Sequence, residues 1–120
     1  DVTVPVAEIP NLLAAIAGWR GQIPDEVTVL PFGHLGDGNL HVNFLLPHAR
    51  AKELTDPLLE RLYDAVDKLR GSISAEHGIG RFKRDEMRGV KSAVELDLMR
   101  RVKRALDPDG LMNPSALLPD

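Results

Sequence analysis

Hydrophobic and polar positions alternate along this chain with two different periods, and the periods divide it into helices and strands. Apolar residues at helical spacing predict a helix over Ile9–Arg20, another from about Asp56 to Leu69, and a third that ends near Leu106. Short apolar runs bounded by proline or glycine predict strands at Asp1–Val4, Val27–Leu30, Asn39–Leu46 and Ser72–Ala75. Up to Ala75, the predicted order is therefore one strand, a helix, two strands, a second helix and a fourth strand.

This order of elements, β-α-β-β-α-β, is typical of an α+β fold with a ferredoxin-like antiparallel sheet and helices on one face. A C-terminal helix and an extended tail over Leu111–Asp120 are appended to it. We expect residues 1–120 to form a single domain, because a chain of 120 residues is long enough to bury one core but not two.

Capping residues refine the helix boundaries. Asp56 is predicted as an N-cap with Pro57 at the first helical position. Ser92 and Glu95 have the spacing of a capping box, in which each side chain binds an amide of the other residue. In the helix that follows, the predicted inner face consists of Val94, Leu98, Val102 and Leu106.

Composition narrows the classes of partner and site. A net charge of −3 gives no reason to expect nucleic acid as a partner. The chain has no cysteine, so a bound metal would rely on nitrogen and oxygen ligands. No apolar run reaches the length of a membrane span and no signal peptide is visible, so we expect a cytoplasmic location. The chain opens on Asp1 in a strand-like run, which suggests a piece of a longer polypeptide.

Three of the four histidines lie in two glycine-bearing segments, and the first segment predicts a β-hairpin. Asp37-Gly38 is a strong signal for a two-residue hairpin turn. With these two residues in the turn, His34 faces His41 directly, and both imidazoles project to the same face. Alternation places Asn43 on this polar face as well, and a longer turn would offset the two histidines without separating them far.

A third ligand would complete a metal site. Glu76 is the best candidate, because two histidines and one carboxylate form a known catalytic zinc set that leaves one position open. Other divalent first-row metals suit the same set. His77, next to Glu76, would point elsewhere and could act as a base. The alternative interpretation, that these are strand-end histidines and an ordinary surface Glu-His pair, stays open on residue chemistry alone.

At these residues the chain resembles a known family. Gly33-His34-Leu35-Gly36-Asp37-Gly38-Asn39-Leu40-His41 and Ser72-Ile73-Ser74-Ala75-Glu76-His77-Gly78-Ile79-Gly80 are similar to motifs in the C-terminal domain of FAD-linked oxidases. This group includes D-lactate dehydrogenase, the glycolate oxidase FAD subunit and D-2-hydroxyglutarate dehydrogenase, within the vanillyl-alcohol oxidase superfamily. The closing segment Leu111-Met112-Asn113-Pro114 is also similar, so the resemblance covers essentially the whole chain.

The resemblance implies roles that the residues alone do not. It implies His34, His41 and Glu76 as metal ligands, usually of zinc, Asn43 as a substrate-contacting residue, and His77 as the base that takes the substrate hydroxyl proton. It further implies oxidation of a small 2-hydroxy acid, the D-enantiomer, to the 2-oxo acid by hydride transfer to FAD. The FAD would be held mainly by an N-terminal FAD-binding domain of the same polypeptide, and no residue of this chain is assigned to it.

The resemblance implies that this chain is the domain of an oxidoreductase that binds the substrate and the metal, and that it is inactive by itself. Two other functions remain as alternatives: a stand-alone metal-dependent hydrolase that uses the same ligands, and a non-catalytic ferredoxin-like binding module. The acid oxidised, the electron acceptor and the metal are left open. A bare flavin-facing surface would favour self-association of the isolated chain as a homo-oligomer.

Overall fold

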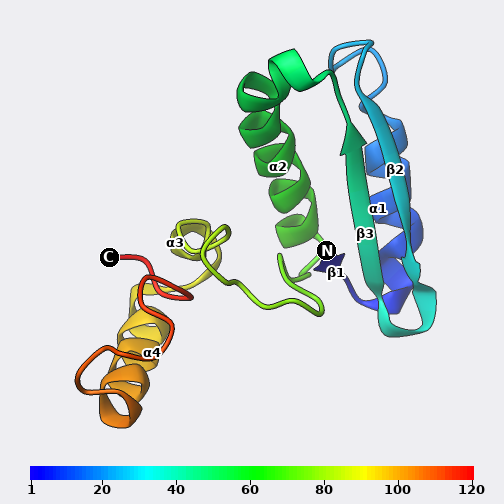
Figure 1. Cartoon of the computed structure of the whole chain (residues 1–120). Coiled ribbons are helices and arrows are strands. Elements are labelled where there is room, and N and C mark those ends of the chain that lie inside the picture. Colours follow the sequence, from blue (N-terminus) through cyan, green and yellow to red (C-terminus); the bar gives the residue numbers. More distant parts are fainter. The chain divides into compact units, whose positions relative to one another are not determined.

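The computed structural model describes residues 1–120, which fall into two units, Asp1–Glu76 and His77–Asp120. The first unit contains strands β1 (Val2–Thr3), β2 (Thr28–His34) and β3 (Asn39–Leu45), and helices α1 (Ile9–Ala17) and α2 (Ala51–Lys68). Short 3₁₀ turns lie at Val6–Glu8 (η1), Leu35–Asp37 (η2) and His48–Arg50 (η3). The second unit contains α3 (Met87–Val90) and α4 (Ala93–Leu106) (Figure 1).

The sheet has three antiparallel strands in the order β1-β3-β2, so β3 is central. Its combination with helices confirms the predicted α+β class. The predicted strand at Ser72–Ala75 is wrong, because only an isolated bridge forms there: Thr3 and Ser72 exchange two backbone hydrogen bonds of 2.9 and 2.7 Å. The chain then turns, since the Ser72 hydroxyl accepts the amide of Ser74 at 3.2 Å and competes with further pairing.

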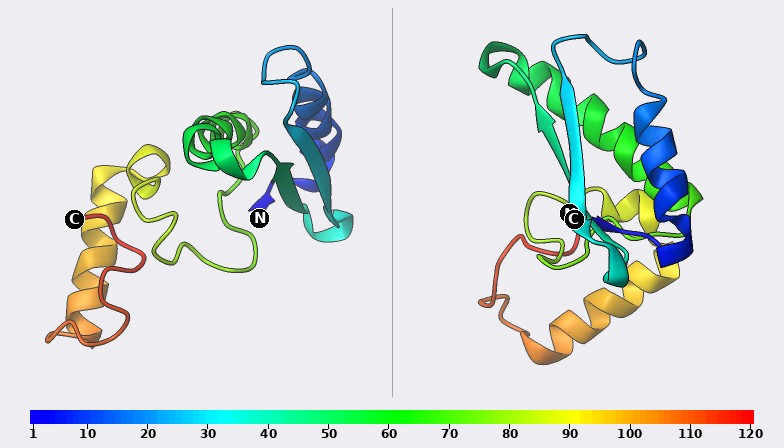
Figure 2. Two further views of the ribbon diagram at one scale, coloured as in Figure 1. Left: turned by 45° about the horizontal axis from the view of Figure 1, so that its top comes forward. Right: turned by 90° about the vertical axis from the view of Figure 1, so that its right-hand side faces the viewer.

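Both long helices of the first unit pack on the same face of the sheet (Figures 1 and 2). Leu54 and Leu58 of α2 pack with Val27 in one buried cluster, which the side chains of Val29 and Phe44 extend. The fully buried side chains of the core are Val2, Leu12, Leu40 and Val66, contributed by β1, α1, β3 and α2. The opposite face of the sheet carries no helix of this unit.

Two prolines lie inside elements where the sequence predicted a boundary. β2 continues through Pro31 to His34, and β2 tolerates it because it pairs with a neighbour on one side only. α2 begins at Ala51, not near Asp56, so Pro57 lies inside the helix. A proline in a helix interior costs about 3 kcal/mol. Burial of Leu54 in the added first turns contributes about 1.5–3 kcal/mol and offsets that cost.

In the second unit, the capping box at the start of α4 is confirmed. The Ser92 hydroxyl accepts the amide of Glu95 at 3.2 Å, and the Glu95 carboxylate accepts the amide of Ser92 at 2.9 Å. The backbone amide and the hydroxyl of Ser92 both donate to the Glu95 carboxylate, and together with a hydrogen bond from Lys91 they lower the pKa of Glu95 from 4.5 to about 2. At the other end of α4, the buried Asp107 carboxylate accepts the amides of Leu111 and Met112 and so ends the helix.

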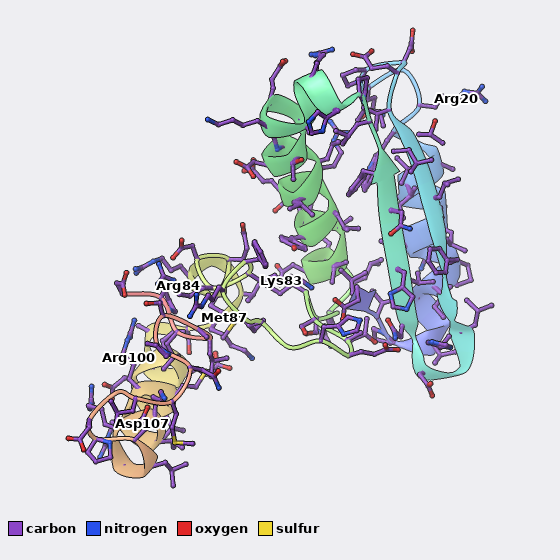
Figure 3. All side chains as sticks on the ribbon, viewed as in Figure 1. Arg20, Lys83, Arg84, Met87, Arg100 and Asp107 are labelled. Atoms are coloured by element: carbon purple, nitrogen blue, oxygen red, sulfur yellow. The ribbon has the colours of Figure 1, made fainter.

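The predicted inner face of α4 is wrong. Its four apolar residues are exposed: Val94 78%, Leu98 59%, Val102 51% and Leu106 77%. The tail Leu111–Asp120 binds another side of the helix (Figure 3). There the Arg100 guanidinium donates to the Pro119 carbonyl at 2.9 Å and Lys103 donates to the Met112 carbonyl at 2.6 Å. Leu96, one turn before Arg100, is buried. None of the helices is both long and apolar enough to span a membrane.

The hairpin turn supplies a stability test. A Cβ at Gly38 would lie 2.1 Å from the Val4 carbonyl oxygen, and its φ of +70° is in the left-handed region. We expect Gly38→Ala to lower the free energy of unfolding by about 2–5 kcal/mol, measured by chemical denaturation. Gly36→Ala is the matched control, because a Cβ there meets nothing within 4 Å. Equal stability of the two variants would contradict the inference that a side chain at position 38 collides with the backbone at Val4.

The capping box supplies a pH test. Because the pKa of Glu95 is depressed in the folded state, its contribution to stability is present above pH 4.5 and is lost as the pH falls toward about 2. We expect Glu95→Gln to melt at a lower temperature than the wild type at neutral pH and at the same temperature near pH 2, measured by circular dichroism. Asp97→Asn, at an exposed position of the same helix, is the control. A pH-independent difference would contradict the role of the Glu95 charge.

Candidate metal centre

The register of the β2–β3 hairpin decides which side chains share the open face of the sheet. His34 pairs with Asn39, and Phe32 pairs with His41. The predicted direct pairing of His34 with His41 is therefore wrong, and the two histidines are diagonal neighbours. They nevertheless project to one face, since their positions are related by the period of two, and their ring centroids lie 5.9 Å apart with the planes at 82°.

The turn itself explains this offset. The connection has four residues, because Leu35–Asp37 forms a 3₁₀ turn that Gly38 closes by donating its amide to the Leu35 carbonyl at 3.3 Å. A two-residue turn of the predicted type needs positive φ at both Asp37 and Gly38, and only Gly38 has it. The Gly38 carbonyl also accepts the amide of Val4 at 3.0 Å, which fixes the turn against the end of β1.

His34, His41 and Glu76 come together at this end of the sheet. One ligand atom from each lies within 4.8 Å of the other two, and His34 Nε2 is 3.5 Å from a Glu76 carboxylate oxygen, Oε1. Ligand atoms about 2.0–2.2 Å from a tetrahedral zinc lie roughly 3.4 Å from one another. The three donors therefore need only a small contraction to hold one divalent ion. His34 and Glu76 are exposed and His41 is half-buried, so a fourth position would open to solvent or a ligand.

Two residues from distant parts of the chain fix Glu76. The Asp1 carboxylate accepts the backbone amides of Ala75 at 2.9 Å and Glu76 at 2.8 Å, which holds the segment beside β1. The Asn39 side-chain amide donates a short hydrogen bond to Glu76 Oε1. Sequence reasoning did not predict the contact of Asn39 with Glu76, and nothing in the sequence pointed to Asp1.

Asn39 is polar but only 4% exposed. Its Nδ2 donates to Glu76, while its Oδ1 is buried and accepts no hydrogen bond. A buried acceptor without a donor costs about 1–3 kcal/mol. Such a cost is unusual outside sites where position matters more than stability.

Apolar side chains border the three donors on the same face. The Phe32 ring lies against the His41 imidazole, with centroids 5.2 Å apart and the planes tilted by 38°. Phe32 is 56% exposed, and Leu30, two residues earlier on β2, is 46% exposed. Asn43 pairs with Leu30, lies two residues after His41 on β3 and is exposed. A bound ligand could therefore contact the side chains of His41, Phe32, Leu30 and Asn43.

His77 does not belong to the three-donor cluster. It directly follows Glu76 in the chain, is exposed, and is the first residue of the second unit. Its predicted role as a base stays a prediction, as does the contact of Asn43 with substrate.

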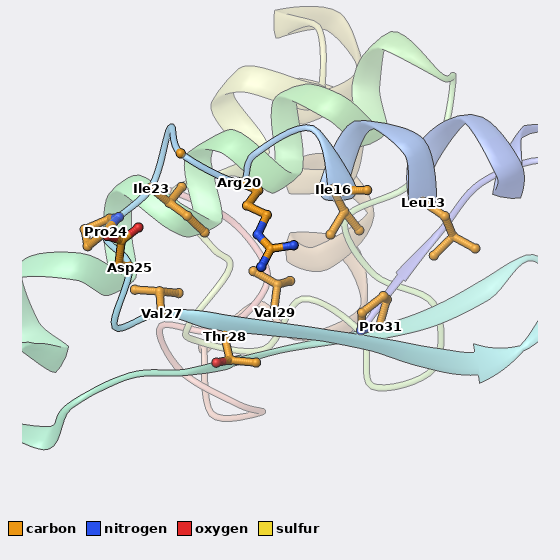
Figure 4. A pocket seen from close by; sticks show the side chains of 12 residues that line it. Leu13, Ile16, Arg20, Ile23, Pro24, Asp25, Val27, Thr28, Val29 and Pro31 are labelled. Carbon is orange, nitrogen blue, oxygen red and sulfur yellow. The ribbon is translucent and has the colours of Figure 1, made fainter.

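A separate groove of about 700 Å³ lies between α1 and β2 (Figure 4). Its lining includes Ile16, Val29 and Pro31, with the Arg20 side chain above Val29. Val29 and Pro31 alternate along β2 with Leu30 and Phe32, so this groove lies on the helix-covered face of the sheet. It is thus distinct from the three-donor cluster and brings no histidine or metal-ligand set together.

Comparison with known proteins shows the family of this chain. The model of the family described as FAD linked oxidases, C-terminal domain, matches residues 1–117, so the chain belongs to this family. It is 38% identical to D-2-hydroxyglutarate dehydrogenase of Stutzerimonas stutzeri (strain A1501), over 98% of this chain and 26% of that protein.

Two mitochondrial relatives give the same result. The chain is 42% identical to D-2-hydroxyglutarate dehydrogenase, mitochondrial, of Arabidopsis thaliana and 38% identical to the protein of that name from Bos taurus. Each alignment covers 99% of this chain and 21% of the relative. The chain thus spans between a fifth and about a quarter of the length of these relatives. The predicted family is confirmed.

Metal content tests the three-donor cluster. We expect the purified chain, after incubation with zinc and removal of the excess, to hold about one ion, measured by mass spectrometry. His34→Ala and His41→Ala should each lose it, because two remaining donors bind too weakly to survive desalting. His48→Ala is the matched control, since His48 is exposed in η3 and outside the cluster. Retention of zinc by both cluster variants would exclude these histidines as ligands.

Proposed function

We propose that this chain is the substrate- and metal-binding domain of an FAD-dependent enzyme that oxidises a 2-hydroxy acid, the D-enantiomer, to the 2-oxo acid. The observation that carries the proposal is the convergence of His34, His41 and Glu76 on the open sheet face of a FAD-linked oxidase C-terminal domain. Relatives named D-2-hydroxyglutarate dehydrogenase support the 2-hydroxy acid as substrate class.

The donor set suits a divalent metal, zinc in the first place. Two imidazole nitrogens and one carboxylate oxygen form a set that leaves a coordination position open. The buried Asn39, which holds Glu76 at the cost of its own unpaired acceptor, is further support for a site built to position ligands. An ion held here would supply Lewis acidity toward the substrate hydroxyl and carboxylate.

The other residues of this face would bind and orient the substrate. Asn43 offers an amide to a carboxylate or hydroxyl oxygen, and Phe32 and Leu30 would exclude water from one side of it. His77 would take the proton from the hydroxyl oxygen as the α-carbon is oxidised. FAD bound by another part of the longer polypeptide would supply the acceptor for the hydride from that carbon. The partner of this domain in the proposal is therefore the FAD-binding domain of the same polypeptide.

The two alternative functions use the same residues differently. A hydrolase would use the metal to activate water without flavin, and a binding module would keep the histidines as structural residues. The family and the names of the relatives both favour oxidation over hydrolysis. The exposure of His34 and Phe32 argues against a purely structural role, because structural side chains are normally packed.

The proposed base can be tested in the longer flavoprotein that carries this domain. We expect His77→Ala to slow flavin reduction by a D-2-hydroxy acid by about 10²–10⁴-fold, measured by anaerobic stopped-flow absorbance at the flavin band. His48→Ala serves as the control for loss of an exposed histidine elsewhere. An unchanged reduction rate in His77→Ala would remove His77 from the mechanism, and hydrolytic turnover without flavin would favour the hydrolase instead.

A further inference from the structure

Asn39 is the one residue near the three donors whose polar atoms are almost completely buried. It is 4% exposed, begins β3, and pairs with Thr3 of β1 on one side and His34 of β2 on the other. Its backbone is therefore fixed by both neighbouring strands. A short side chain on such a backbone has little freedom, so the position of its amide is set by the sheet.

The amide makes a single side-chain contact, and that contact is with the carboxylate donor. Asn39 Nδ2 donates to Glu76 Oε1, the same oxygen that lies 3.5 Å from His34 Nε2. Glu76 does not lie on a strand, and its backbone amide donates to the Asp1 carboxylate. A glutamate side chain on such a segment has several rotamers, and the hydrogen bond from Asn39 selects one that faces His34.

The unpaired Oδ1 shows that this placement is not made for stability. An apolar side chain of the same size would avoid a buried acceptor without a donor. The sequence instead keeps a polar group at this buried position, and the one hydrogen bond that its side chain makes is to Glu76.

We propose that Asn39 is a positioning residue that orients Glu76 as the carboxylate ligand of the metal centre. This inference rests on the proposed metal site and assigns to it an outer hydrogen-bond partner. Carboxylate ligands are commonly held in this way, and loss of the partner typically weakens metal binding by about 10–100-fold.

The test is a double-mutant cycle of zinc affinity in the 120-residue chain, by competition with a chromophoric chelator. We expect Asn39→Leu to weaken zinc binding by about 10–100-fold while the fold is retained, because leucine has a similar size and needs no donor. In the Glu76→Ala background the same substitution should change zinc affinity by less than about twofold, since Asn39 acts through Glu76.

Two further measurements separate positioning from a structural role. The metal-free Asn39→Leu variant should unfold at the same or a higher denaturant concentration than the wild type, whereas a residue needed for the fold would lower it. Cobalt bound in place of zinc should show a changed visible spectrum in Asn39→Leu. The matched control is Asn11→Ala, because Asn11 on α1 donates a 2.7 Å hydrogen bond to the Glu8 carboxylate in η1, and its loss should leave zinc affinity unchanged.

The outcomes distinguish this inference from the proposed function. Wild-type zinc affinity in Asn39→Leu, or an equal loss with and without Glu76, would overturn the positioning role and leave the metal site standing. A wild-type chain that binds no zinc would overturn the metal site and the positioning role together. If Asn39→Leu does not fold, Asn39→Ala is measured in the same double-mutant cycle. Wild-type zinc affinity, or an equal loss with and without Glu76, would then overturn the positioning role in the same way.

Discussion

The antiparallel pairing of β3 with β1 on one side and β2 on the other is the constraint on which the rest of this structure depends. Side chains alternate between the faces of the sheet, so a slip of one residue would turn His41 toward the helices and Leu40 toward solvent. Leu40 is only 1% exposed in the core, and its burial opposes such a slip. The hydrophobic core on one face thus determines the donor geometry on the other.

The same strands hold the donors in place from outside the hairpin. β1 contributes Thr3, which receives the bridge from Ser72, and the adjacent Asp1 accepts the amide of Glu76. The segment that follows α2 therefore does not need to form a full strand in order to bring Glu76 to His34. The bridge at Ser72 and the Asp1 carboxylate both hold its backbone, and Asn39 then orients the Glu76 side chain.

This organisation suits a domain that completes a site in a larger enzyme. The helix-covered face is packed, whereas the face with the three donors is open and includes the exposed apolar residues Phe32 and Leu30. Under the function proposed above, this open face would meet the substrate and a flavin bound by another part of a longer polypeptide. Polar donors and an apolar border on one surface are the requirements for binding a small hydroxy acid away from water.

Local sequence determined the elements whose signals lie within a few residues. These are the three predicted helices, the capping box at Ser92 and the two strands of the hairpin. Alternation along β3 was enough to place His41 and Asn43 on one face, and the family motifs identified the family. The structure alone decided the four-residue turn, because its conformation depends on the hydrogen bond between Val4 and Gly38.

The structure also decided what depends on contacts between distant residues. The loss of the strand at Ser72 follows from a local serine turn, but the position of Glu76 follows from Asp1 and Asn39, which lie 75 and 37 residues away in sequence. The exposed stripe on α4 has the same origin, since the tail Leu111–Asp120 binds the side of the helix that carries Arg100 and Lys103. Periodicity shows that a helix has an apolar face, whereas tertiary packing determines which side is covered.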